Sequence, residues 1–156
     1  QSIGTGLPKG YNVKEFSSIY KTNTNESRYY TVLVDNTFWW YEPTAQVWSQ
    51  SIGTGLPANY NVKEFSSIYK TQTSESRYYI VLSDNTFWRF EPKAKVWTQS
   101  IGTGLPEGYN VKEFSSIYKT NTNESRYYTV LVDNTFWWYE PKAQVWTQST
   151  GTGLPE

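Results

Sequence analysis

Short runs of apolar and aromatic residues alternate with polar, turn-forming stretches along the whole chain. No segment of eleven or more residues shows an apolar period of 3.6, so the pattern does not favour helices beyond a single turn near residues 13–16. Four runs rich in β-branched and aromatic residues occur in the first third of the chain, at residues 13–20, 28–34, 37–41 and 46–50. Each run has the length of a β-strand, so the pattern predicts an all-β fold.

Turn-forming residues separate these runs. Residues 3–11 hold Gly4, Gly6, Pro8 and Gly10 and predict a loop, whereas residues 22–27, 35–36 and 42–46 predict turns. We expect Asn36 to serve the turn that it forms with Asp35.

The chain consists of three copies of one 49-residue unit. Residues 2–50, 51–99 and 100–148 align without a gap, and residues 149–156 repeat the start of a fourth linker. The first and third copies differ at three positions, whereas the second differs from the first at eleven, one of which places Arg89 at the position of Trp40. We therefore treat residues 1–156 as a single repeat domain, produced by recent duplication or by engineering.

Four short strands in a unit of this length are typical of one blade of a β-propeller, a small antiparallel sheet that needs neighbours on both faces. Propellers contain about four to eight blades, so three blades cannot close a ring. We predict a β-propeller whose ring is completed by oligomerisation, most simply as a homodimer with six blades. The alternative is a monomeric β-trefoil, which also has three four-stranded repeats. Its lectin branch carries a Gln-x-Trp pattern that residues 46–48 and 144–146 match.

Composition excludes several classes of partner. Fourteen basic and fourteen acidic residues cancel and no basic run occurs, so we expect no nucleic-acid binding. No apolar run reaches about 18 residues, so we expect no membrane insertion. Aromatic residues make up 19% of the chain, and burial must therefore depend on them.

Catalytic and metal-binding patterns are weak. The chain has no His and no Cys, and no acidic cluster has the spacing of a metal site, so we expect no enzyme activity, metal or cofactor. Each copy offers one carboxylate pair of the kind that a glycosidase needs, Asp35 and Glu42 in the first. Three near-identical active sites in one small chain would be unusual, whereas three weak binding sites gain from avidity.

The strand predicted at residues 37–41 is aromatic on both faces. Side chains alternate along a strand, so Phe38 and Trp40 share one face and Trp39 and Tyr41 the other. The counterpart of Trp40 is Arg89, and an unpaired Arg is costly deep in a core, so this position is expected at a groove or edge. A Trp there could stack on the apolar face of a sugar or form a protein contact.

The order of motifs, SIGTGLP, FSSIY, SRYYTVL, DNTFWWYEP and VW, resembles the blades of fucose-binding and tryptophan-repeat propeller lectins. Weaker resemblances are to hemopexin-like and kelch blades. The lectin resemblance implies sugars between adjacent blades and few-blade chains that complete a ring. It also implies that Arg28, Arg77 and Arg126 donate hydrogen bonds to sugar, whereas an ion pair of Arg28 with Glu26 or Glu42 is the structural alternative. The carboxylate that these lectins carry within the Trp-rich strand is missing here, and Glu42 follows that strand.

The sequence therefore predicts a multivalent, lectin-like propeller that binds glycans. The alternatives are a structural or engineered symmetric scaffold without a ligand and a hemopexin-like protein-interaction domain. The candidate ligand-binding residues are Arg28, Trp40, Glu42, Arg77, Glu91, Arg126, Trp138 and Glu140.

Overall fold

The computed structural model describes residues 4–155, which form twelve β-strands and no helix. The first sheet contains β1 (Val13–Lys21), β2 (Glu26–Leu33), β3 (Phe38–Glu42) and β4 (Val47–Ser51). The second contains β5 (Val62–Lys70), β6 (Glu75–Leu82), β7 (Phe87–Glu91) and β8 (Val96–Ser100). The third contains β9 (Val111–Lys119), β10 (Glu124–Leu131), β11 (Phe136–Glu140) and β12 (Val145–Ser149).

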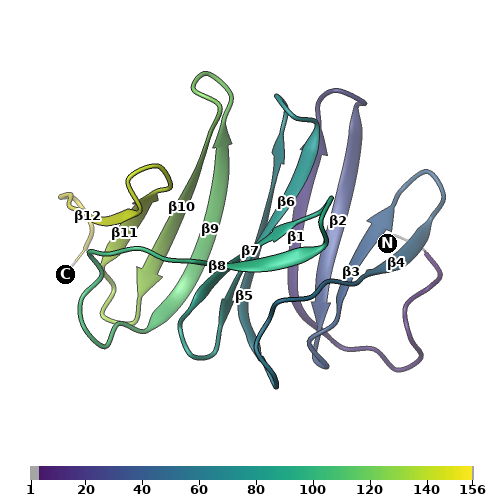
Figure 1. The fold of residues 1–156 in the computed structure, drawn as a ribbon, viewed down its shortest axis with the longest axis horizontal. Coiled ribbons are helices and arrows are strands. Elements are labelled where there is room, and N and C mark those ends of the chain that lie inside the picture. The colour runs from purple at the N-terminus through teal and green to yellow at the C-terminus, as the bar shows by residue number, and fades with distance from the viewer. Residues whose placement is uncertain (1–3, 156) are drawn as a thin grey trace.

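Each copy of the sequence forms its own antiparallel sheet, with the strands in chain order (Figure 1). We call these sheets blades 1, 2 and 3. The predicted all-β class with three four-stranded blades is confirmed. The β-trefoil alternative is wrong, because the strands of different copies do not join into one barrel.

Strand boundaries differ slightly from those predicted. β2 begins at Glu26, which pairs with Lys21, because the turn before it ends at Asn25 with a left-handed φ of 56°. β4 begins at Val47, since Gln46 has the same left-handed conformation and belongs to the turn. Residues 13–16 are extended and contain a β-bulge rather than a helical turn.

The blades meet most closely at their first strands. β1 lies beside β5, and β5 lies beside β9. The Ser17 and Ser67 hydroxyls are 2.7 Å apart across the first boundary, and those of Ser66 and Ser116 are 2.7 Å apart across the second. Blade 2 thus lies between blades 1 and 3, with β1, β5 and β9 along the inner edge of the array (Figure 1).

The hydrophobic core lies between blades rather than within them. One cluster fills the boundary of blades 1 and 2, and a second fills the boundary of blades 2 and 3. Phe38 of blade 1 packs on Phe65 and Trp97 of blade 2, with ring centroids 6.2 and 4.9 Å apart. Phe87 repeats this contact on blade 3. Phe38 and Phe87 therefore pack between blades.

Polar contacts also join the blades. Asn36 has a φ of 66° in its turn, and its Oδ1 accepts a hydrogen bond from the backbone N–H of Val62, at 2.9 Å. The Tyr60 hydroxyl donates to the Asn36 carbonyl, at 2.8 Å. Asn85 makes the same two contacts to blade 3. Asn36 therefore serves the turn, as predicted, and also joins two blades.

The Gly-rich linker runs beside the last strand of each blade. Thr103 forms a parallel bridge with Val145, and the neighbouring Gly104 has a φ of +106°. A Cβ on Gly104 would lie 2.2 Å from the carbonyl oxygen of Trp146. Gly108 also has a positive φ, but a Cβ there would meet nothing within 4 Å, and blade 2 carries Asn59 at this position.

We therefore expect Gly104→Ala to destabilise the fold by about 3 kcal/mol or more, because the methyl group must displace the backbone of β12. Gly108→Asn should change the free energy of unfolding by less than about 0.5 kcal/mol. Chemical denaturation followed by Trp fluorescence measures both. Equal effects of the two substitutions would contradict this account of the linker.

Three equivalent carboxylates, Glu15, Glu64 and Glu113, lie on the inner strands. Burial and the charges of Glu15 and Glu113 raise the pKa of Glu64 to about 7, and Lys63 opposes this only in part. Burial and the charge of Glu113 raise the pKa of Glu15 as well. The inner edge of the array is therefore less stable when Glu15 and Glu64 are ionised.

The pKa of Glu64 rises from its ordinary 4.5 to about 7 on folding, so the folded protein binds this proton more tightly than the unfolded chain does. The protonated carboxyl contributes its full stability below pH 4.5, and this contribution is lost as the pH rises through the folded pKa of about 7. We expect the free energy of unfolding of wild type, relative to that of Glu64→Gln, to fall by about 1–2 kcal/mol between pH 4.5 and pH 7.5. This is less than the free energy that corresponds to the full pKa shift, because the side chain is partly solvated. Urea denaturation at each pH measures it. The exposed Glu107→Gln variant should give a flat difference, and a flat difference for Glu64→Gln would refute the assignment.

Candidate functional site

The three Arg residues predicted for the site each bind two carboxylates. Arg28 on β2 contacts Glu26 at 3.1 Å and Glu42, at the end of β3, at 3.0 Å. Arg77 and Arg126 make the same pairs: 2.8 Å to Glu75, 2.7 Å to Glu91, 3.1 Å to Glu124 and 3.1 Å to Glu140. The ion pairs named as the structural alternative therefore form, with both carboxylates at once.

Trp40 lies on the same face of the blade as Arg28. The Arg28 guanidinium carbon is 5.1 Å from the centroid of the Trp40 ring, within the range of a cation–π contact, and Arg126 lies at the same distance from Trp138. Trp40 is half-buried and also packs against the core between blades 1 and 2. It shares a face with Phe38, as predicted, but it is less open to solvent than a free stacking platform.

The structure thus gathers the eight candidate residues into one cluster per blade. The clusters are Arg28, Trp40 and Glu42; Arg77 and Glu91; and Arg126, Trp138 and Glu140. Arg89 occupies the position of Trp40 in blade 2 and is exposed. Sequence reasoning named Glu26 only as an ion-pair alternative and missed Glu75 and Glu124. A Glu two residues before an Arg in a strand faces the same side, and this spacing was the available signal.

The clusters differ in the donors that they leave free. Arg28 bonds both carboxylates through Nη2, so its Nη1 has no partner among residues 4–155, and its buried Nε has none either. Arg126 repeats this arrangement. Arg77 instead uses Nε, Nη1 and Nη2 for its two carboxylates. Blades 1 and 3 therefore keep Arg donors that blade 2 does not.

The clusters of blades 1 and 2 face the following blade. Tyr30 lies on the same face of blade 1 as Arg28, and its hydroxyl donates a hydrogen bond to Ser76 of blade 2 at 3.1 Å. Burial raises the pKa of Tyr30, so its hydroxyl stays protonated.

Between blades 2 and 3 the corresponding region is a groove of roughly 340 Å³. Its walls include Lys70, Arg77, Tyr79, Arg89 and Glu91 from blade 2 and Glu124, Ser125, Tyr127, Glu140 and Lys142 from blade 3.

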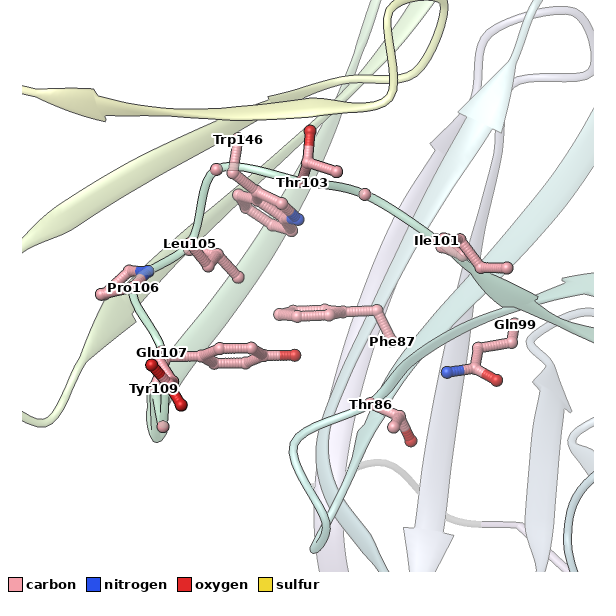
Figure 2. A pocket seen from close by; sticks show the side chains of 14 residues that line it. Thr86, Phe87, Gln99, Ile101, Thr103, Leu105, Pro106, Glu107, Tyr109 and Trp146 are labelled. Atoms are coloured by element: carbon pink, nitrogen blue, oxygen red, sulfur yellow. The ribbon is translucent and has the colours of Figure 1, made fainter.

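A second hollow, of roughly 300 Å³, lies under the Gly-rich linker between blades 2 and 3 (Figure 2). Phe87 and Trp146 line it, but their rings pack on each other at 4.9 Å and are only 7% and 5% exposed. Its charged residue, Glu107, is replaced by Lys9 and Ala58 in the other copies. The Arg and its two carboxylates instead recur in all three blades, so we place the candidate site in the groove beside this cluster.

Within residues 4–155 no group of three acidic side chains is arranged to hold a metal ion. The same residues include no helix that could cross a membrane.

Comparison with known proteins identifies the fold. No protein-family model matches the chain, and no curated protein matches it by sequence. Among solved structures, the chain is similar to a fucose lectin from Kordia zhangzhouensis in complex with methyl-fucoside, with a TM-score of 0.52 and 12% sequence identity. The match covers 88% of this chain and 99% of the lectin chain. The likeness shows a shared fold and agrees with the lectin resemblance noted from the motifs.

Proposed function

We propose that the chain is a multivalent, non-catalytic carbohydrate-binding protein whose sugars bind in the grooves between blades. The observation that carries the proposal is the cluster itself. An Arg held by two carboxylates recurs in all three blades, a groove lies beside it between blades 2 and 3, and a fucose lectin shares the fold.

The chemistry of the cluster in blades 1 and 3 suits a neutral sugar. The Nη1 group of Arg28 can donate to a hydroxyl or to the ring oxygen, and the oxygens of Glu42 can accept from neighbouring hydroxyls. The exposed part of Trp40 offers an apolar surface to the C–H groups of a pyranose. Because the two carboxylates already hold the guanidinium in place, a sugar meets a pre-organised donor.

The sequence of blade 2 suggests a site variant and a control variant that the fold should tolerate, because each introduces residues that blade 2 already carries. The site variant, Trp40→Arg with Trp138→Arg, places in blades 1 and 3 the residue that blade 2 has at Arg89. Val34→Ser with Val132→Ser changes two exposed positions to the residue of Ser83.

We expect wild type to bind neutral monosaccharides, tested first with methyl-fucoside, and the double Trp variant to bind about tenfold or more weakly because it loses the indole surface. The double Val variant should bind as wild type does. A glycan array competed with free sugar, followed by calorimetry, measures this. A blank array with folded protein would favour a scaffold without a ligand, and undiminished binding by the Trp variant would place the site elsewhere.

We further propose that two copies of the chain close a six-blade ring. Each copy of residues 4–155 contributes three blades, and six is the multiple of three within the range of known propellers. Aromatic and aliphatic side chains are open at both ends of the array: Val13, Phe16 and Tyr20 on blade 1 and Ile117, Tyr128 and Phe136 on blade 3, with 38–58% exposure. Their copies at the internal boundaries, Val62, Phe65, Tyr69, Ile68, Tyr79 and Phe87, are at most 7% exposed.

The two open faces are the two halves of the boundary that already occurs twice within the chain. Phe136 of one copy should meet Phe16 of the other, as Phe38 meets Phe65. In the closed ring, blade 1 of the second copy would face Arg126 and Trp138, as blade 2 faces Arg28 within one chain. The third sugar site is therefore complete only in the assembled ring.

We expect a mass of about 36 kDa in solution, twice the 18.2 kDa of the chain. Phe16→Glu should give a monomer, because it places an unpaired charge where the aromatic face packs. Val34→Ser, at an equally exposed position, should remain a dimer. Light scattering after size-exclusion chromatography distinguishes them, and a monomeric wild type at micromolar concentration would disprove closure by two chains.

A further inference from the structure

In the wall that it contributes to the groove, blade 2 differs from the matching residues of blades 1 and 3 at one position, where Arg89 stands in place of Trp40 and Trp138. Arg89 is exposed, and its cross-strand neighbours Tyr79 and Thr98 are uncharged. Among residues 4–155 it forms no ion pair. Its guanidinium is therefore free for a ligand in the groove.

Arg89 lines the same groove as Tyr127 of blade 3. Burial raises the pKa of the Tyr127 hydroxyl on that blade, and the positive charge of Arg89 opposes the rise. The charge acts in the same way on Tyr79, on the blade 2 wall. A ligand between the two walls would lie within reach of this guanidinium.

The carboxylates of this groove are already paired with other cations. Glu91 is bound to Arg77, Glu140 to Arg126, and Glu124 to both Arg126 and Lys142. The hydrogen bond from Arg126 also lowers the pKa of Glu124, which keeps this group ionised within its pairs. The walls carry four basic residues (Lys70, Arg77, Arg89 and Lys142) against three acidic ones (Glu91, Glu124 and Glu140). The groove thus has one positive charge in excess, and Arg89 lacks a counter-ion.

Arg77 cannot take over the role that Arg28 has in blade 1. Its Nε and Nη2 donate to Glu75, and its Nη1 contacts Glu91. The groove between blades 2 and 3 therefore has neither the indole surface nor the spare Arg donors of the other clusters, and it has a free guanidinium instead.

We propose, resting on the function proposed above, that the groove between blades 2 and 3 binds a sugar that carries a negative charge. A guanidinium matches the two oxygens of a carboxylate or of a sulfate ester, so the ligand class is a uronic acid or a sulfated sugar. A cavity of roughly 340 Å³ lies within the range of small-ligand sites. Each chain would then carry two kinds of site, one for charged and one for neutral sugars.

The test uses calorimetry on the assembled protein with matched pairs of methyl glycosides. The pairs are glucuronide against glucoside and galacturonide against galactoside, with galactose 6-sulfate as a separate arm. We expect at least tenfold tighter binding of an anionic member at one site per chain, and a loss of this preference at 0.5 M salt, where the Debye length is only about 4 Å. Preference confined to the uronides identifies a carboxylate site, and preference confined to the sulfate identifies a sulfate-ester site.

Two variants that each remove one positive charge distinguish a specific contact in the groove from an effect of the net charge of the protein. Arg89→Trp copies blades 1 and 3 and should weaken anionic binding at least tenfold. Lys95→Gln copies Gln46 at an exposed position outside the groove and should leave it unchanged. Trp40→Arg should raise the number of anionic sites from one to two per chain.

The outcomes are distinguishable from those that bear on the general function. Methyl-fucoside or another neutral sugar that binds, together with no anionic preference in any pair, would overturn this inference and leave the carbohydrate-binding proposal standing. The charged-sugar inference is also overturned if Arg89→Trp and Lys95→Gln change anionic binding equally, or if Trp40→Arg adds no anionic site. The carbohydrate-binding proposal would still stand in both cases. A folded protein that binds neither neutral nor anionic sugars would overturn both.

Discussion

The rest of the structure depends on one constraint: each blade is a four-stranded sheet with aromatic side chains on both faces. Such a sheet cannot bury either face by itself, because its strands are short and it has no helix to cover it. Phe38 and Trp40 on one face of blade 1 need blade 2, and Phe65 on blade 2 needs blade 1. Folding therefore depends on stacking blades, and the two ends of the array leave exposed the apolar side chains that an internal boundary buries.

The same stacking positions the candidate site. Blades are closest where their inner strands meet, and the clusters lie where β2 begins and β3 ends, beside the groove. An Arg at that place is partly buried, with 17% of the Arg28 side chain exposed, so it requires counter-charges that stay with it. Glu26 and Glu42 supply them from two different strands. The ion pairs and a binding role are thus compatible, because pairing through Nη2 alone leaves Nη1 free.

Repeats and short strands made the blade architecture predictable, and alternation along the strand correctly placed Trp40 on the face of Phe38. The Arg–Glu42 pair was also within reach of sequence reasoning. What could not be predicted depends on contacts between copies. Asn36 was expected only in its turn, yet its side chain joins two blades, and the half-buried state of Trp40 follows from packing against blade 2. The raised pKa of Glu64 likewise requires carboxylates on two other blades to converge.

The distribution of differences among the copies follows from the same constraint. Each internal boundary repeats the same face-to-face contacts, so a change on a buried face must fit its neighbour, and only two of the eleven differences between the first two copies fall on buried side chains, Thr31/Ile80 and Tyr41/Phe90. The position of Trp40 and Arg89 lies at the rim, where one side chain can be exchanged for another without opening the core. A repeat protein of this kind is therefore free to diversify its grooves one blade at a time, while the faces that hold the blades together stay almost the same. Chemical variety among the sites of a single chain needs no change of architecture.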